Sequence, residues 1–446
     1  MSDDSPAGVL ERRLAERSAV IGVVGLGYVG LPLAAAAAKA GFPTRGFDID
    51  TAKIGLIEAG QSYIDAVPSD ELAEHVDAGR FEATDDFGRL QECDVIAIAV
   101  PTPLSRQREP DLRFVVSTAE AIAACLRPGQ LVVLESTTWP GTTEEVIKPI
   151  LERDGFISGR DFFIAFSPER EDPGNAVYRT VTIPKVVAGE GEQASVLVRA
   201  FYDAVVDKVV SVSSPKVAEA VKITENVFRA VNIALVNELK VIYDAMEIDV
   251  WEVIDAAATK PFGYMPFYPG PGLGGHCIPI DPFYLTWKSR EFGLTTRFIE
   301  LAGEINVGMP HYVISRLERA LDQFQKCSLS SARILILGLA YKKNVSDIRE
   351  SPALELFELL SRRGADVAYH DPFVPVVPQT REYGHLAGRA SVDLTPDAVA
   401  SFDVVLVITD HDAVDYENLA ENARLIVDTR NVFARKGVFA EKLVKA

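Results

Sequence analysis

One cysteine stands in a stretch that is unusually rich in glycine and proline. Cys277 follows the pair Gly274 and Gly275, and the carboxylate of Asp281 lies four residues further along. Glycines let a ligand approach the backbone closely, and a thiolate in such a loop could attack an aldehyde to form a thiohemiacetal. Loss of a hydride to a nicotinamide cofactor would then give a thioester, which water would hydrolyse to a carboxylate. A lone cysteine is more often an inert small hydrophobic residue, so the residue alone leaves both interpretations open.

A lysine and an asparagine four residues apart offer partners for such chemistry. Lys222 and Asn226 lie in the run 216–246, which contains no glycine or proline. A helix there would place both side chains on one face, where together they could stabilise an oxyanion. A solvated lysine beside a packing asparagine is the plainer alternative, and the spacing by itself does not decide between them.

The residues that would bring a dinucleotide to this chemistry lie near the N-terminus. An apolar run at 20–24 is followed by Gly25, Gly27 and Gly30 in a G-x-G-x-x-G pattern, and an alanine-rich helical stretch comes directly after. The first glycine permits the tight turn, the second the approach of the pyrophosphate, and the third close packing of helix and strand. Asp48 ends the next apolar run, at the offset expected for an acid that binds a ribose 2′-hydroxyl. Because a carboxylate repels a 2′-phosphate, the pattern predicts NAD rather than NADP.

Apolar β-branched runs alternate with helical stretches on both sides of the long helical run. This alternation predicts an α/β fold with two Rossmann-like, doubly wound domains joined by a long central helix. The expected domains are 1–211, 212–325 and 326–446. The central helix could be a dimer surface or a plain buried connection. The expected strands are 20–24, 44–47, 95–100, 131–134, 162–166 and 185–187 in the first region and 334–337, 367–369, 404–408 and 425–427 in the second.

Composition limits the partners. The chain has 446 residues and a formal net charge of −19, which argues against nucleic acid because phosphate binding needs a basic surface. No apolar run is long enough to span a bilayer and no signal peptide is visible, so no membrane association is expected. The four cysteines, Cys93, Cys125, Cys277 and Cys327, follow neither a zinc nor a disulfide spacing. This scatter fits a reducing cytoplasm and predicts no bound metal.

These features lie within a set of longer motifs, which in type and order resemble the UDP-glucose/UDP-N-acetyl-hexosamine 6-dehydrogenase family over residues 20–432. The resemblance implies two Rossmann-like domains joined by a long helix, NAD as cofactor, and a homodimer or higher homo-oligomer formed through the central region. The motifs are Gly-Leu-Gly-Tyr-Val-Gly-Leu-Pro at 25–32, Phe-Ser-Pro-Glu-Arg at 166–170, Lys-Ile-Thr-Glu-Asn at 222–226, Gly-Gly-His-Cys-Ile-Pro-Ile-Asp-Pro at 274–282 and Tyr-Lys-Lys-Asn-Val-Ser-Asp-Ile-Arg-Glu-Ser-Pro at 341–352.

The resemblance also implies a four-electron oxidation of C6 of a UDP-sugar that uses two NAD and one water. Cys277 matches the nucleophile that carries the thiohemiacetal and the thioester, and Lys222 and Asn226 match the residues that stabilise the oxyanion. A one-step alcohol dehydrogenase or an epimerase on the same scaffold would not need this thiol. A catalytically silent nucleotide-sugar-binding protein would be expected to have lost one or more of these residues.

Hydrolysis and binding roles carry over by the same match. Asp281 would move protons or position the hydrolytic water together with Thr137, and Glu169 would support thioester hydrolysis. The loop 267–275 would hold the sugar and uracil, and residues 326–446 would form the UDP-sugar-binding domain. The residues matched to the NAD site are Gly25, Gly27, Tyr28, Val29, Gly30, Asp48, Thr102, Thr137 and Arg349. Those matched to the UDP-sugar site are Glu169, Arg170, Lys222, Asn226, Lys260, Phe267, Tyr268, Gly274 and Lys342.

Two positions depart from the pattern of the UDP-glucose enzymes. Some of these enzymes carry a second glutamate four residues after the one matched by Glu169, where this chain has Pro173. Many have an arginine before the glycine-rich loop, where this chain offers Lys260 as a replacement. With the Pro-Gly-Pro-Gly before the cysteine motif, these positions are similar to the branch acting on N-acetylated sugars. The expected reaction converts UDP-N-acetylglucosamine to UDP-N-acetylglucosaminuronate for surface polysaccharide. UDP-glucose, UDP-N-acetylgalactosamine and UDP-N-acetylmannosamine are the alternative substrates.

Overall fold

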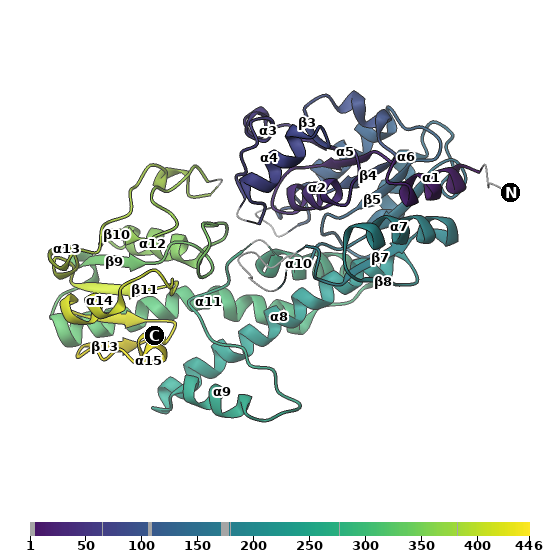
Figure 1. Cartoon of the computed structure of the whole chain (residues 1–446). Coiled ribbons are helices and arrows are strands. Elements are labelled where there is room, and N and C mark those ends of the chain that lie inside the picture. The colour runs from purple at the N-terminus through teal and green to yellow at the C-terminus, as the bar shows by residue number, and fades with distance from the viewer. Residues whose placement is uncertain are drawn as a thin grey trace. The chain divides into compact units, whose positions relative to one another are not determined.

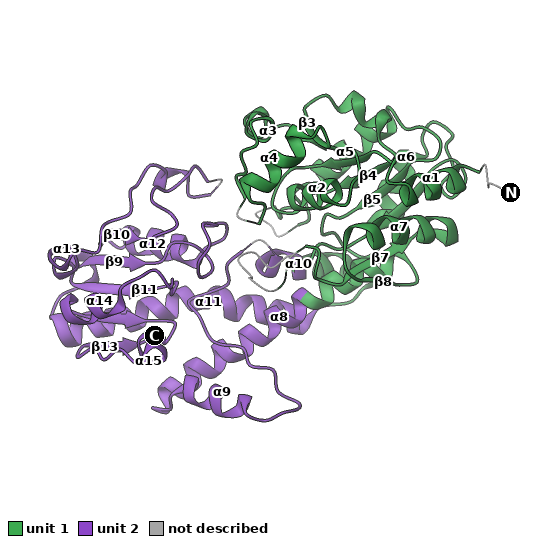
Figure 2. Ribbon diagram, in the orientation of Figure 1, with its two compact units in different colours: residues 1–225, 283–295 green, residues 226–282, 296–446 purple. Residues whose placement is uncertain are grey.

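The chain divides into two compact units (Figure 2). Unit 1 comprises residues 1–225 and 283–295, and unit 2 comprises residues 226–282 and 296–446. Two helices, α8 (Pro215–Ala245) and α10 (Cys277–Ser289), contribute residues to both. The computed structural model describes residues 5–64, 66–105, 109–170, 178, 180–275, 277–380 and 382–446. Pro173 and His276, which the sequence motifs include, lie outside the described residues.

Unit 1 is built on an eight-stranded sheet in the order β3-β2-β1-β4-β5-β6-β7-β8 (Figure 1). Neighbouring strands pair in parallel except β6 and β7, which are antiparallel. In sheets of this order ligands bind beyond the carboxyl ends of the strands at the point where the connections change direction, here between β1 and β4. The strands are β1 (Ile21–Val24), β2 (Thr44–Phe47), β3 (Phe81–Thr84), β4 (Val95–Ile98), β5 (Leu131–Leu134), β6 (Phe163–Phe166), β7 (Lys185–Gly189) and β8 (Val209–Ser211).

Successive residues of each strand point to opposite faces of the sheet. Apolar residues therefore emerge on both faces, and helices cover them. One apolar core combines strand residues such as Ile21 and Val23 with buried residues of α1, α2, α3, α4 and α7. Right-handed crossovers between β4, β5 and β6 place α5 and α6 on the other face. The helices are α1 (Pro6–Ala15), α2 (Gly30–Lys39), α3 (Thr51–Glu58), α4 (Ser69–Asp77), α5 (Arg113–Ala123), α6 (Lys148–Leu151) and α7 (Gly191–Val205), with a π-helical turn η2 (Thr143–Ile147) before α6.

Unit 2 combines helices with a five-stranded parallel sheet in the order β10-β9-β11-β12-β13. The connections change direction between β9 and β11, so the ligand-binding rule for such sheets points to the loops that follow these two strands. The strands are β9 (Arg333–Leu337), β10 (Asp366–His370), β11 (Val404–Val407), β12 (Ile426–Asp428) and β13 (Leu443–Lys445). The further helices are α9 (Val250–Ala258), α11 (Arg297–Ala320), α12 (Pro352–Arg362), α13 (Pro396–Ala400), α14 (Tyr416–Asn422) and α15 (Val432–Lys436).

The expected fold class, with two Rossmann-like sheets and a long helix from residue 215, is confirmed. Three strands were not expected, and all three lie at sheet edges: β3, β8 and β13. Edge strands are short and partly exposed, so they lack the continuous apolar run that marks a buried parallel strand. The stretch around Cys277 that the sequence suggests is a loop becomes helical at this residue, because α10 begins at Cys277. Pro279 lies in the first turn, where prolines are tolerated, and Pro282 lies inside the helix.

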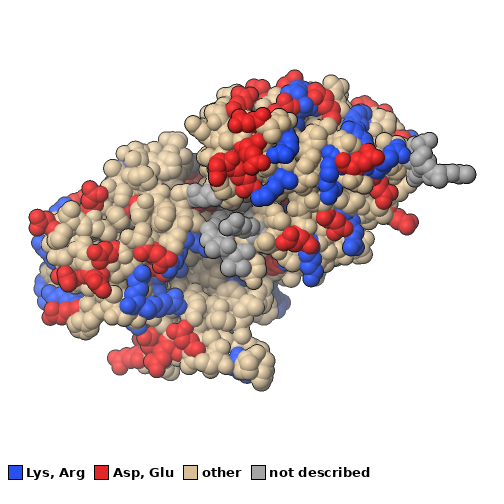
Figure 3. Space-filling view, viewed as in Figure 1, with Lys and Arg blue, Asp and Glu red and all other residues tan. Residues whose placement is uncertain are grey.

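The described surface carries both signs of charge. On the face drawn in Figure 3, acidic and basic side chains are intermixed over unit 1, and no continuous basic stripe is visible among the described residues. This distribution agrees with the acidic net charge of −19. Within the described ranges, none of the helices combines the length and the apolar character that a membrane crossing requires.

Candidate active site

The glycine-rich turn after β1 gives each glycine a different environment. Gly25 adopts a φ of +91°, and a Cβ there would meet the carbonyl oxygen of Ala99 at 2.6 Å. At Gly30, the first residue of α2, a Cβ would lie 1.8 Å from the carbonyl oxygen of Gly25. A Cβ on Gly27 would meet no atom within 4 Å, so the turn is open on that side. The three positions fit the tight turn, the close packing and the open cradle that a pyrophosphate needs.

The N-terminus of α2 follows this turn and is suited to an anion. Val29 is its N-cap residue and makes no side-chain capping hydrogen bond, and the first helical turn holds no acidic side chain. Tyr28, one residue earlier, packs against the apolar core of unit 1. The positive end of the helix dipole is therefore not neutralised by a neighbouring carboxylate within the helix.

Asp48 lies directly after β2 and is 7% exposed. Its Oδ2 accepts a hydrogen bond from the backbone N–H of Leu26 at 2.9 Å, and its Oδ1 accepts one from the N–H of Asp50 at 3.0 Å. The Nζ of Lys53 lies 3.5 Å from Oδ2. The carboxylate is thus held against the glycine-rich turn, where an acid that binds a ribose hydroxyl would be expected.

The loops after β4 and β5 carry the two threonines matched to the cofactor site. Thr102 is 4% exposed, and its carbonyl oxygen accepts a hydrogen bond from the hydroxyl of Tyr284 at 3.0 Å. The Oγ of Ser136 donates to the carbonyl oxygen of Val100 at 2.7 Å, which ties the two loops together. Thr137 follows in the chain and is half-buried. Thr102 follows β4 and Thr137 follows β5, so both lie beyond the carboxyl ends of strands, where ligands bind in sheets of this kind.

Lys222 and Glu169 form a buried ion pair. The Nζ of Lys222 donates to the Oε2 of Glu169 at 2.8 Å and to the carbonyl oxygen of the same residue at 2.6 Å. The two residues are 3% and 7% exposed. The long helix α8 thus presents its lysine to the segment after β6, and a buried charge pair of this kind can create a strong local field because water does not screen it.

Arg170 contacts the same helix, α8, about one turn beyond Lys222. Its guanidinium donates to Glu225 at 2.5 and 3.3 Å and to the carbonyl oxygen of Pro184 at 2.6 Å. The sequence motif assigns Arg170 to the sugar site. In the structure, these contacts orient its side chain toward α8 and the start of β7.

Cys277 is the first residue of α10 and is half-buried. Asp281 lies one helical turn later and is 1% exposed. The N-terminus of a helix favours a negative charge, so this location suits a thiolate. The side chain of Asn226 donates through Nδ2 to the Oδ2 of Asp281, which brings together two of the residues that the motifs predicted.

Arg229 extends the hydrogen bonding of Asn226 and Asp281, and the sequence motifs did not include it. Its guanidinium donates to the Oδ1 of Asn226, three residues earlier on α8. Because Oδ1 accepts from Arg229, the donor group Nδ2 of Asn226 must face Asp281. The spacing of three residues between an arginine and a predicted oxyanion donor on one helix was the sequence signal that could have identified it.

The loop 267–275 is packed against elements of unit 2. The ring of Phe267 meets that of Phe228 at a centroid distance of 5.8 Å, and a Cβ on Gly274 would lie 2.7 Å from the Cβ of Tyr341. Gly275 donates through its N–H to the carbonyl oxygen of Arg349 at 3.2 Å. The loop is therefore joined to the 341–352 motif, as two adjacent parts of one ligand site would require.

Tyr268 and Lys260 contact other groups. The hydroxyl of Tyr268 donates to Asp255 at 2.6 Å, and its ring stacks on Trp251 and lies 4.3 Å from the guanidinium carbon of Arg435. Lys260 is exposed after α9, with its Nζ 5.0 Å from the centroid of the Phe262 ring. Among the contacts of the described residues, neither side chain touches another of the predicted site residues.

The turn after β9 repeats the arrangement after β1. Gly338 has a φ of +85°, and the following N–H, of Leu339, donates to the Oδ2 of Asp371 at 2.6 Å. In unit 1 the N–H of Leu26, which follows Gly25, donates to Asp48 in the same way. In each unit the glycine directly follows one strand and the acid directly follows the neighbouring strand. The turns after β1 and β9 are thus held by the same kind of hydrogen bond.

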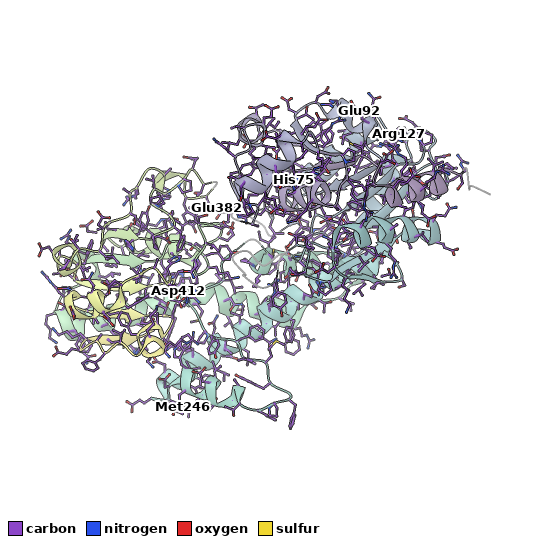
Figure 4. The ribbon with its side chains drawn as sticks, in the orientation of Figure 1. His75, Glu92, Arg127, Met246, Glu382 and Asp412 are labelled. Carbon is purple, nitrogen blue, oxygen red and sulfur yellow. The ribbon has the colours of Figure 1, made fainter. Side chains whose placement is uncertain are left out.

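His411 contacts Asp371, the acid that holds the turn after β9. Its Nε2 lies 3.0 Å from the Oδ2 of Asp371, and its Nδ1 accepts from the N–H of Asn344 at 3.0 Å. Burial opposes ionisation of Asp371, but the hydrogen bonds from His411 and from backbone N–H groups hold its pKa below the usual range. Asp412, labelled in Figure 4, pairs with Lys343 at 2.6 Å. The side chains after β11 therefore hold the 341–352 motif in place.

Lys342 and Arg349, two basic residues of the 341–352 motif, differ in their surroundings. Lys342 is half-buried, and Arg349 is exposed and forms a two-pronged contact with Asp347 at 2.6 and 3.0 Å. An arginine oriented in this way can still present further N–H groups to a phosphate.

Glu219 is a second buried group that the motifs did not include. It is fully buried on α8 and accepts hydrogen bonds from the N–H of Gly141 and from the N–H and Oγ1 of Thr143, the last two at 2.9 and 2.7 Å. Burial raises its pKa from 4.5 to about 7, although these hydrogen bonds oppose the rise. Glu219 therefore fixes the loop that carries Thr137 to the helix that carries Lys222.

Three family models match the chain in sequence order. Residues 19–206 match the NAD binding domain of the UDP-glucose/GDP-mannose dehydrogenase family, residues 216–307 its central domain, and residues 335–435 its UDP binding domain. The matched ranges include the glycine-rich turn, the long helix with the cysteine motif, and the second glycine turn described above.

Individual relatives cover almost the whole chain. A UDP-N-acetyl-D-glucosamine 6-dehydrogenase of Pseudomonas aeruginosa is 36% identical over 92% of this chain and 95% of its own length. An NDP-N-acetyl-D-galactosaminuronic acid dehydrogenase of Ralstonia solanacearum is 33% identical over 94% and 97%. The solved structure of a UDP-D-ManNAc dehydrogenase from Pyrococcus horikoshii aligns with a TM-score of 0.84 and 32% identity, covering 96% of this chain and 98% of that one.

Proposed function

Because the chain belongs to the UDP-glucose/GDP-mannose dehydrogenase family, we propose that it oxidises C6 of UDP-N-acetylglucosamine to a carboxylate. As a member of this family it is an NAD-dependent oxidoreductase acting on a nucleotide-sugar. The observation that carries the four-electron form of the reaction is the environment of Cys277. This thiol begins a helix, and Asp281 lies one turn later with its carboxylate hydrogen-bonded to Asn226.

The proposed reaction balances with two NAD and one water for each sugar. Removal of a hydride and a proton from the C6 alcohol gives an aldehyde, and the thiolate of Cys277 adds to that carbonyl. Removal of a second hydride from the thiohemiacetal leaves a thioester. Water then cleaves the carbon–sulfur bond, which regenerates the thiol and releases the carboxylate. Bound NAD supplies the chemistry of accepting each hydride.

The chain's own residues hold the cofactor and support these steps. The open side of Gly27 and the N-terminus of α2 would accept the pyrophosphate, and Asp48 would bind the ribose hydroxyls. Lys222 and Asn226 would stabilise the oxyanions at C6, because a buried ammonium and a fixed amide donor favour a developing negative charge.

Thioester hydrolysis requires a positioned water and a base. Asp281 and Glu169 are the buried carboxylates assigned to this step, and each already has an oriented hydrogen-bond donor, Asn226 and Lys222 respectively. Thr137 is proposed to help position the water. A carboxylate of this kind accepts the proton that water loses as it attacks the thioester.

Most of the residues assigned to the nucleotide-sugar belong to unit 2. The match of residues 335–435 to a UDP binding domain supports the placement of UDP beside the 341–352 motif, with Lys342 and Arg349 facing phosphates or cofactor. The loop 267–275 would hold the uracil and sugar, together with Arg170 and Lys260. The choice of an N-acetylglucosamine substrate is supported by the 36% identity to the Pseudomonas aeruginosa enzyme.

A homodimer formed through the central region is part of the proposal. Phe228, Leu235 and Ile242 recur every seven residues on α8 and are 48%, 49% and 45% exposed. Met246, which Figure 4 labels just beyond the end of this helix, is 59% exposed. Exposed apolar side chains in one stripe favour burial against another protein surface. Light scattering should give a dimer or larger oligomer, and Leu235→Glu should lower the mass; a monomeric wild-type protein would contradict the proposal.

The stoichiometry of NADH tests the reaction. Purified protein with UDP-N-acetylglucosamine and excess NAD should form two NADH for each sugar consumed and yield a uronate by mass spectrometry. One NADH with an aldehyde product would indicate a one-step dehydrogenase instead. UDP-glucose, UDP-N-acetylgalactosamine and UDP-N-acetylmannosamine should give lower kcat/KM in parallel assays, and a higher value for any of them would correct the substrate.

The role of the thiol needs a matched control. Cys277→Ser should form no uronate. Cys327→Ser should keep normal turnover, because Cys327 lies between the π-helical segment 321–325 and β9, outside the predicted cysteine motif. Full four-electron turnover by Cys277→Ser would remove this residue from the nucleophile role.

A further inference from the structure

Two buried asparagines connect the glycine-rich loop to the helices of unit 2. Asn237 on α8 and Asn306 on α11 are 0% and 2% exposed. The Oδ1 of Asn237 accepts from the N–H of Gly270 at 3.0 Å, and its Nδ2 donates to the Oδ1 of Asn306 at 2.8 Å. The Nδ2 of Asn306 then donates to the carbonyl oxygen of Ala230 at 3.1 Å.

This chain of hydrogen bonds has only one possible direction. At one end a backbone N–H can only donate, and at the other end a backbone carbonyl can only accept. Both amide orientations are therefore fixed, and a flip of either would place two donors or two acceptors against each other. Because buried amides are costly without partners, the chain holds Gly270 in one position relative to α8 and α11.

A second contact limits Gly270 from another side. A Cβ on this residue would lie 2.7 Å from an Nη atom of Arg430, whose Nε donates to the carbonyl oxygen of Ile408 at 2.7 Å. The loop is thus confined between an arginine that is itself anchored and an amide that is itself oriented. Gly270 immediately precedes the residues 271–275, which lead to the cysteine motif.

We infer that Asn237 is a positioning residue for nucleotide-sugar binding, acting through the backbone of Gly270 and oriented by Asn306. This inference rests on the proposed assignment of the loop 267–275 to the nucleotide-sugar. Asn237 itself touches no ligand in this scheme. It keeps the loop in its binding conformation before the ligand arrives, so that the cost of ordering the loop is not subtracted from affinity.

The test measures binding of UDP and of NAD separately by calorimetry on the full-length protein. Asn237→Leu should weaken UDP binding about tenfold, the loss expected for one buried hydrogen-bonded group, and leave NAD affinity within about twofold. Asn306→Leu keeps the bond to Gly270 but removes the group that orients Asn237, so a smaller loss is expected. In steady-state assays the KM for the nucleotide-sugar should rise while kcat at saturation is retained.

The matched control is Asn232→Leu, the same substitution on the same helix. The amide of Asn232 donates only along its own helix, to the carbonyl oxygen of Phe228 at 2.7 Å, among the contacts that the structure describes. Its UDP affinity should equal that of the wild type. NAD affinity also reports whether each variant is folded. If Asn237→Leu does not fold, Asn306→Leu tests the same chain of hydrogen bonds.

Two results would overturn the inference. Wild-type UDP affinity in Asn237→Leu would show that the loop does not depend on this amide, and an equal loss of UDP and NAD binding would indicate a general structural role. A wild-type protein that binds no UDP would instead refute the proposed assignment of the loop, and the inference with it.

Discussion

The buried carboxyl of Glu219 should titrate near neutral pH. Burial raises its pKa from 4.5 to about 7, while hydrogen bonds from Gly141 and Thr143 and the nearby charge of Glu144 act in opposite directions and are smaller. About half of the molecules should therefore carry a neutral Glu219 at pH 7. Glu219→Gln removes this titration but retains the size and shape of the side chain.

The magnitude follows from the two pKa values. A rise from 4.5 to about 7 corresponds to about 3 kcal/mol. Because the folded protein binds the proton more tightly than the unfolded chain, this contribution is fully present below pH 4.5 and is lost as pH rises through 7. The free energy of unfolding of the wild type, relative to Glu219→Gln, should therefore fall by about 3 kcal/mol across that interval.

Two measurements check the predicted titration of Glu219. Denaturant unfolding, followed by the fluorescence of the three tryptophans, can be compared at the two ends of the interval. An infrared difference spectrum between wild type and variant should show the protonated carboxyl band disappear with a midpoint near pH 7. Glu238→Gln, an exposed position on the same helix, is the control and should show no such band. A midpoint near 4.5, with an unfolding difference that is independent of pH, would refute the reasoning.

Three further substitutions test the assigned residues. Lys222→Met leaves Glu169 buried without its cation, so kcat should fall by about 100-fold or more while NAD affinity is retained; an unchanged kcat would remove Lys222 from catalysis. Arg229→Met should lower kcat about tenfold because the amide of Asn226 loses its orienting donor. Arg229→Lys should recover part of that loss, and equal rates in all three proteins would contradict the role. Asp48→Asn should reduce the preference for NAD over NADP, measured as the ratio of kcat/KM values, at least about tenfold, and an unaltered ratio would place the ribose elsewhere.

The sequence predicted the fold where the physical signal is local. The buried strands read as continuous apolar runs, and the long helix reads as a run without glycine or proline, so both were placed within a few residues. The G-x-G-x-x-G turn was also predictable, because the demands on Gly25, Gly27 and Gly30 come from the turn itself. The edge strands β3, β8 and β13 have no such signal, since β3 alternates buried residues with less buried ones, β8 is mostly exposed and β13 is half-buried throughout.

The candidate site was predicted as a set of residue types, and its hydrogen bonds were not. Lys222 and Asn226 share a helix face by their spacing, but only the folded chain shows that one pairs with Glu169 and the other with Asp281. These partners are more than 50 residues away in sequence. The repeated hydrogen bond between turn and acid at Gly338 also escaped the sequence, because it depends on which strand lies beside which.

The long helix α8 supplies hydrogen-bond partners to several segments that are distant from it in sequence. Glu219, Lys222, Asn226 and Arg229 follow one another at intervals of three, four and three residues, which keeps their side chains on one face. A buried polar side chain without a partner costs free energy, so the partners of these side chains stabilise the fold. Glu219 therefore fixes the loop after β5, Lys222 the segment after β6, and Asn226 the helix that begins with the thiol. Asn237, further along the helix, fixes the glycine-rich loop. One helix of 31 residues thus supplies partners to segments of both units.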